Sequence, residues 1–163
     1  MMRTALSVAA IVLVASQIGG VRGQAQPASY GTALTGTIQS PICSSDNFAS
    51  GDVSGDLNGS FYVAFDCQDE TILGGSWLIL VTAERADGAR DVLGTIRGQV
   101  LNGSFEPGGD SARITVRDVV LAVSEGTGQY ATVTEGSGSL QATSDTRDTP
   151  QFVGRLGLTF TSP

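Results

Sequence analysis

The chain has 163 residues, with 16 acidic side chains against 9 basic ones, and every basic residue is an arginine because lysine and histidine are absent. Histidine is the commonest metal ligand and the usual general base near neutral pH, so its absence excludes Ser-His-Asp triads and most zinc sites. The lack of lysine excludes Schiff-base catalysis. The negative charge repels nucleic acid and anionic lipid headgroups, and neither is expected as a partner.

Residues 1–25 have the three parts of a cleavable secretory signal peptide. Arg3 supplies the positive start, and an uncharged apolar stretch covers residues 5–18. That stretch is about 14 residues long, against the roughly 20 that a membrane-spanning helix needs, so it predicts a leader and no membrane span. Small residues favour cleavage after Ala25, with cleavage after Gly23 as the alternative. The protein is therefore expected to be secreted or periplasmic.

The mature part, residues 26–163, has the usual size of one domain with its own core. It keeps seven arginines against all 16 acidic residues, which gives a formal charge of −9. Cys43 and Cys67 both lie in it, and they predict one disulfide because an exported chain meets an oxidising compartment. Closing a loop of this length would stabilise the fold by roughly 3 kcal/mol. Two free buried thiols are the alternative.

From Tyr30 onward, apolar residues recur at every second position and the runs are broken by Gly, Asn, Asp and Pro, which is typical of half-buried strands. No segment has helical periodicity. The segment around Trp77 is apolar on both faces and predicts a central strand, followed by a turn at Asp87-Gly88. The predicted strands are residues 32–39, 53–57, 60–67, 76–84, 92–101, 112–124, 129–134, 137–143 and 152–161.

The 22 glycines fall inside the strand patterns as well as between them, as at Gly94, Gly98, Gly154 and Gly157. Glycines inside strands mark bulges and sharp bends, which allow a sheet to curl and close. We therefore expect an all-β domain built as a single antiparallel β-barrel of about eight strands. A β-sandwich is the alternative, since the same alternation serves both folds.

A weak internal repeat relates residues 51–61 to residues 94–105, with one residue added before the Asn. Asn58-Gly59 and Asn102-Gly103 are each the dipeptide that a two-residue hairpin turn prefers. The repeat thus predicts two similar halves, each made of a strand, a tight turn and a strand. Both dipeptides also begin formal Asn-x-Ser sequons, and we favour the turn interpretation over glycosylation.

The segment Gly126-Thr-Gly-Gln-Tyr-Ala-Thr-Val-Thr-Glu-Gly-Ser-Gly-Ser-Leu140 resembles the glycine-rich signature of allene oxide cyclase-like and dirigent-like barrel proteins. The resemblance implies an eight-stranded barrel whose lumen admits side chains or one small apolar ligand. It also implies a function that needs no cofactor, as in cyclases or in dirigent proteins, which orient a reactive intermediate. In physical terms, Gly126 and Gly128 permit a turn and Tyr130 anchors the next strand in the core.

Asp118 is the best candidate for chemistry in such a lumen. In a regular strand it would share a face with Ile114, Val116, Val120 and Ala122. A carboxyl group buried there would have a raised pKa and could act as an acid or a base. The alternative places Asp118 at a bulge, or pairs it with an arginine such as Arg97 or Arg155.

Trp77 is the only tryptophan and could form the floor of a ligand pocket, although packing in the core is the alternative. No metal site is predicted, because the acidic segment Asp66 to Glu70 matches no calcium loop and suits a solvated turn. Two functions remain. The first is a secreted barrel that binds a small apolar molecule in its lumen and, if it is an enzyme, acts as a cofactor-free cyclase or isomerase. The second is a non-catalytic extracellular structural or interaction module whose lumen is filled by its own aromatic side chains, which are Phe61, Phe65, Trp77, Tyr130, Phe152 and Phe160.

Overall fold

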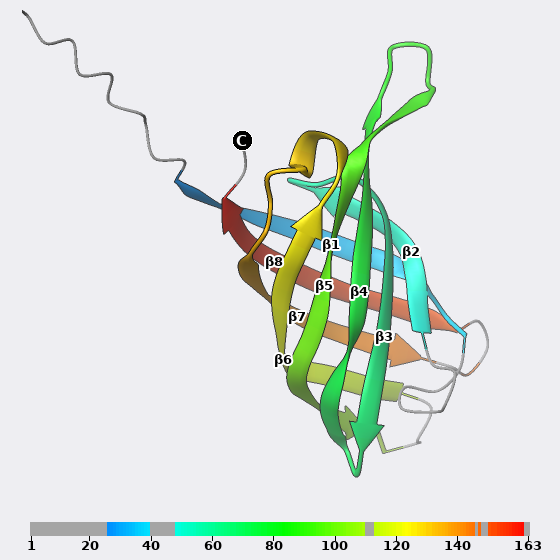
Figure 1. Ribbon diagram of the computed structural model, residues 1–163. Coiled ribbons are helices and arrows are strands. Elements are labelled where there is room, and N and C mark those ends of the chain that lie inside the picture. Colours follow the sequence, from blue (N-terminus) through cyan, green and yellow to red (C-terminus); the bar gives the residue numbers. More distant parts are fainter. Residues whose placement is uncertain (1–25, 40–47, 110–112, 146, 148–149, 162–163) are drawn as a thin grey trace, which may run out of the picture.

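The computed structural model describes residues 26–39, 48–109, 113–145, 147 and 150–161, which form a closed barrel of eight antiparallel strands (Figure 1). Each strand pairs with the next along the chain, and β8 pairs with β1 to close the ring. The barrel prediction is confirmed, and the sandwich alternative is wrong. The strands are β1 (Pro27–Ile38), β2 (Phe48–Gly55), β3 (Gly59–Gln68), β4 (Thr71–Glu84), β5 (Arg90–Pro107), β6 (Arg113–Gly126), β7 (Gly136–Asp145) and β8 (Gln151–Thr161).

The core lies inside the barrel, because alternate residues of every strand point inward. In β8, for example, Phe152, Leu156, Leu158 and Phe160 are buried while Val153 is about half exposed. The buried polar residues in the described part of the chain are Thr32 and Ser144. Such alternation explains why the sequence pattern predicted strands, since each apolar side chain at an inward position leaves water when the ring closes.

Two predicted elements differ from the structure. Residues 129–134 form no strand; the short 3₁₀ helix η1 (Gly128–Tyr130) and a turn stand there instead. Asn102-Gly103 forms no hairpin turn, because β5 continues through it to Pro107. The register of β5 against β6 shifts on both sides of Asn102. Gly103, which was expected to reverse the chain, therefore lies in a β-bulge. The two halves of the repeat are therefore not alike.

The turn predicted at Asp87-Gly88 is confirmed, whereas Asn58-Gly59 is not the predicted two-residue turn, because Gly59 already belongs to β3 and pairs with Val53. The side chain of Asn58 donates to the carbonyl oxygen of Gly55 at 3.2 Å in the connection between β2 and β3. Between β4 and β5, the amide of Gly88 donates to the carbonyl of Arg85 at 2.9 Å, with Gly88 at a φ of 80°. This β4–β5 hairpin projects beyond the rim of the barrel (Figure 1).

The upper end of the barrel in Figure 1 carries the β2–β3, β4–β5 and β6–β7 connections, together with the start of β1 and the end of β8. Leu57 and Val133 belong to two of these connections and are both 2% exposed, so they close this end of the barrel over the core. Within the ranges that the structure describes, no helix is long and apolar enough to cross a membrane.

Candidate functional site: the lumen and its upper mouth

Among the described residues, side chains of the protein itself fill the part of the lumen around Trp77. Phe61 and Phe152 meet across it with ring centroids 5.8 Å apart. Among pockets lined wholly by described residues, the one at the middle of the lumen has a volume of about 10 Å³. A cavity needs roughly 10–15 Å³ to hold one water molecule, so this space is too small for an organic ligand. The inward residues that line it include Leu34, Phe61, Trp77, Leu121, Leu140 and Leu156.

Trp77 of β4 connects its own strand to β5 and β6 from inside the lumen. Its indole Nε1 donates to the carbonyl oxygens of Gln99 at 3.3 Å and of Ala122 at 3.2 Å, which lie on β5 and β6. The ring lies against Gly98, where a Cβ would collide with it and with the carbonyl of Ala122, so only glycine fits there. These contacts favour the packing role for Trp77, which is 5% exposed.

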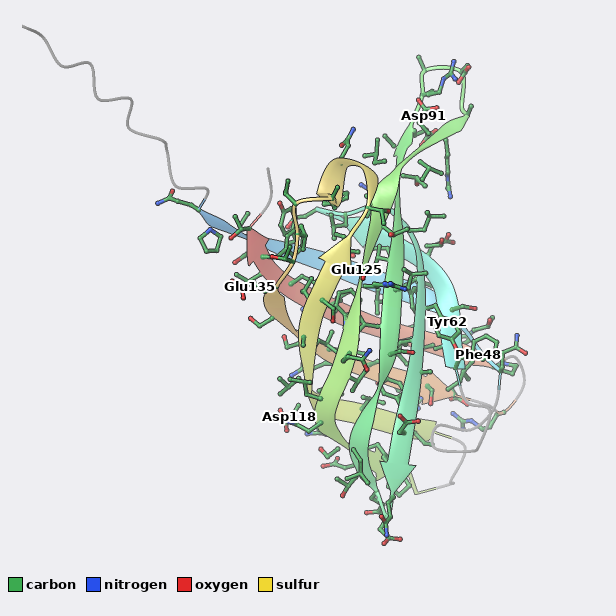
Figure 2. All side chains as sticks on the ribbon, in the orientation of Figure 1. Phe48, Tyr62, Asp91, Asp118, Glu125 and Glu135 are labelled. Atoms are coloured by element: carbon green, nitrogen blue, oxygen red, sulfur yellow. The ribbon has the colours of Figure 1, made fainter. Side chains whose placement is uncertain are left out.

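Asp118 does not point into the lumen. It is an exposed residue with a φ of 52°, and the register of β6 against β7 shifts between Val116 and Val119 (Figure 2). This bulge turns Val119 inward and leaves Asp118 and Val120 outward, so the expected place of Asp118 on the inward face with Ile114 and Val116 is wrong. The alternative of a bulge is what the structure contains. Arg97 forms an ion pair with Glu125 and not with Asp118.

The predicted disulfide cannot be followed in full, because Cys43 lies outside the described residues. Cys67 is half-buried near the end of β3 and packs against the core. The pairing therefore stays a prediction. The predicted leader also lies outside the described residues, so export stays a prediction too.

Ser144 is a feature that the sequence reasoning missed. Its side chain points into the lumen, is fully buried, and its Oγ has no hydrogen-bond partner. Ser144 pairs with Ile114 on β6 and Phe152 on β8, both of them buried apolar residues. The signal was present in the sequence, because Ser144 continues the inward positions of Leu140 and Ala142, but the predicted strand ended one residue before it.

An aromatic cluster of Tyr30, Tyr130 and Phe160 lies beneath the upper mouth. Tyr30 stacks on Phe160 with centroids 4.6 Å apart, and Tyr130 meets the edge of Phe160 at 6.3 Å. Burial raises the pKa of the Tyr130 phenol, and the nearby Tyr30 adds to the rise. Tyr130 therefore keeps its proton at neutral pH. It was expected in a strand, and instead it anchors η1 to the core.

Above this cluster is a partly enclosed cleft of about 640 Å³, which we call the mouth cleft. Its walls are the end of β2 with the β2–β3 connection, the base of the β4–β5 hairpin, and Tyr130 of η1. The charged residues that line it are Asp52, Asp56, Glu84 and Arg90. Asp56 has a structural task, since its Oδ2 accepts the amide of Gly31 at 2.8 Å and ties the β2–β3 connection to β1.

The mouth cleft has the volume of a site for a small organic molecule, which is typically some 300–1,000 Å³. No group of three or more Asp, Glu or Cys side chains that could hold a metal ion occurs among the described residues. The sequence reasoning did not find the cleft, because its walls come from three parts of the chain that are far apart: residues 52–59, the base of the β4–β5 hairpin, and Tyr130.

Comparisons with protein-family models, with curated proteins and with solved structures find no match to this chain. The family resemblance of residues 126–140 therefore stays a prediction. In the structure this segment leads from the end of β6 through η1 to β7. Gly128 has a φ of 61° and lies against the backbone of Leu93, so the expected turn at a glycine is confirmed.

Proposed function

We propose that the mature protein is a secreted, non-catalytic binding module, in which the barrel is a rigid scaffold and the lumen is not a ligand site. The close packing of the lumen around Trp77, within the described residues, carries this proposal. A void of about 10 Å³ beside Trp77 leaves no room for a small apolar molecule. The alternative of a lumen that binds and converts such a molecule would require several core side chains to move together, which close packing opposes.

The chemistry of the buried residues supports a role without catalysis. The buried residues of polar type in the described ranges are Thr32 and Ser144, each with a hydroxyl, and Asp118 lies on the outside of the barrel. A hydroxyl with no base beside it is neither an acid nor a nucleophile near neutral pH. The connections at the upper end, supported by a closed ring of strands, are the natural place for binding.

The proposal is tested by adding a small apolar probe and measuring whether the fluorescence of Trp77 changes, which would report entry of the probe into the lumen. Native mass spectrometry of protein purified without denaturant should give the mass of the bare mature chain, and indole or benzene should not bind. Leu140→Ala is the positive control, because truncating this residue enlarges the existing void and should create a site for benzene. Val153→Ala, on the outer face, is the matched negative control. A stoichiometric adduct on the native protein, or saturable binding of either probe to it, would overturn the proposal.

A further inference from the structure

We propose that the outer face of β4, β5 and β6 is an interface at which two copies of this chain form a weak, symmetric dimer. This face is turned toward the viewer in Figure 1. The inference goes beyond the proposed function and does not depend on it. Two independent observations carry it: a cluster of exposed apolar side chains, and four charges around that cluster whose arrangement is complementary to itself.

The apolar cluster consists of Leu73 on β4, Leu101 on β5 and Val120 on β6, and each of these side chains is between 41% and 57% exposed. The register of the strands places them at one level of the sheet. Val120 pairs with Asn102, next to Leu101. Leu73 lies between residues of β4 that pair with β5 on either side of Leu101. The three side chains therefore form one area on the outside of the barrel, which we call the Leu101 patch.

The Leu101 patch differs from an isolated apolar residue such as Val153. Val153 on β8 is 52% exposed, but its neighbours on the adjoining strands are Thr35 and Thr143. Single exposed apolar residues are normal on soluble proteins, whereas several that adjoin mark a surface that another protein covers. Covering the Leu101 patch removes apolar surface from water, which favours association.

Two ion pairs bridge β5 and β6, one on each side of the Leu101 patch. On the upper side, Arg97 of β5 pairs with Glu125 of β6. On the lower side the signs are exchanged, because Glu106 of β5 pairs with Arg117 of β6 at 3.2 Å. All four side chains are about half exposed or more. The charges thus alternate around the four corners of the patch.

This alternation makes the face complementary to a second copy of itself. A two-fold axis that lies in the plane of the interface, either along or across the strands, places each arginine of one copy over a glutamate of the other. The four charges sum to zero, whereas the mature chain carries a formal charge of −9 and repels its copies elsewhere. A partner surface of one sign would meet two like charges here. The charge pattern therefore favours a second copy over a different protein.

The dimer should be weak. The outer surface of a closed barrel is convex, so two copies touch over few strands and bury less than a standard interface does. Asp118, next to Arg117, is also exposed and adds one negative charge at the lower side. Exposed ion pairs contribute little energy each, so the apolar patch supplies the affinity and the charges determine the orientation. We expect a dissociation constant on the order of 10 µM.

Sedimentation velocity of the mature protein, between about 1 µM and about 1 mM, tests the inference around the expected dissociation constant. The native protein should change reversibly from monomer to dimer over this range. Leu101→Arg should raise the dissociation constant by at least about tenfold, because it replaces the centre of the patch by a charge that meets the same charge on the other copy. Val153→Arg is the matched control, since it makes a similar change at an equally exposed position on β8, and it should stay within about twofold of the native value.

A second experiment tests the charge pattern. Arg97→Glu with Arg117→Glu makes all four corners acidic and gives a formal charge of −9 − 4 = −13. Glu106→Arg with Glu125→Arg makes all four corners basic and gives −9 + 4 = −5. Each of these double variants should remain monomeric by itself, and circular dichroism checks that each is folded. An equal mixture should form a one-to-one heterodimer, although both chains are still negative overall.

Four results would each overturn the inference. They are a native protein that stays monomeric up to about 1 mM, an equal loss of affinity in Leu101→Arg and Val153→Arg, a mixture of the two charge variants that stays monomeric, and an assembly larger than a dimer. None of these results bears on the lumen, which the apolar probes and native mass spectrometry examine separately.

Discussion

Ser144 offers the sharpest test of the packing inside the barrel. Its Oγ is buried without a hydrogen-bond partner, and its strand neighbours are Ile114 and Phe152. Burying an unsatisfied hydroxyl costs about 1–3 kcal/mol relative to a solvated one. Ser144→Ala removes that cost and leaves only a small gap where the oxygen was. We therefore expect the free energy of unfolding to rise by about 1 kcal/mol, after part of the gain is lost to the gap.

Guanidinium unfolding followed by circular dichroism measures this change. For a domain of this size the gain corresponds to a rise in Tm of about 3 °C, which differential scanning calorimetry can resolve. Thr143→Ala is the control, because Thr143 immediately precedes Ser144 and lies on the outer face. Its free energy of unfolding should stay within about 0.5 kcal/mol of that of the native protein. A loss of 1 kcal/mol or more on Ser144→Ala, at an unchanged denaturant slope, would refute the reasoning, because the hydroxyl would then have a partner.

Three further changes have clear expected outcomes. Trp77→Phe removes the donor to two carbonyls and opens a gap, and should lower the free energy of unfolding by about 2 kcal/mol; a loss below half of that would contradict the bracing role. Asp69 and Glu70 both have positive φ, at 47° and 62°, so Asp69→Asn with Glu70→Gly should stabilise the β3–β4 turn by about 1–2 kcal/mol in a thermal melt, and an unchanged Tm would show that no strain is stored there. The pKa of Tyr130 is raised above its usual 10.0, so the unfolded chain loses this proton first as the pH rises. The stability that comes from keeping the Tyr130 phenol protonated is fully present below pH 10.0 and is lost as the pH rises above it. Tyr130→Phe should therefore lose less free energy of unfolding at alkaline pH than the native protein, in unfolding experiments at a series of pH values. The same dependence of the free energy of unfolding on pH in both proteins would contradict the burial of the phenol.

Much of the fold could be predicted because inward and outward residues alternate so regularly. The residues at which strands end or become irregular were harder to predict. Nothing local in Asn102-Gly103 distinguishes a hairpin turn from a bulge, and the choice depends on β6, which pairs with β5 at this point and takes up the irregularity. Asp118 shows the same limit, since one residue with positive φ exchanges the two faces of the strand beyond it.

The candidate site was less predictable than the fold. The aromatic residues of the sequence suit either a ligand pocket or a filled lumen, and only their packing, with Phe61 against Phe152 and Trp77 across Gly98, decides between the two. The mouth cleft depends on contacts that no local pattern encodes. Asp52, Glu84 and Tyr130 come together because the ring closes and brings three connections to one end.

The pairing of β8 with β1 also determines how the chain must fold. Pro27 pairs with Thr161, 134 positions later, while every other neighbouring pair of strands is consecutive along the chain. Contacts between residues so distant form late, because a long loop must be ordered before they can stabilise anything. Until that moment β1 and β8 each have an unpaired edge, the part of a sheet most prone to pair with another chain. Once the ring closes, both edges disappear together, so we expect a late step of folding to be also the step that protects the protein from aggregation.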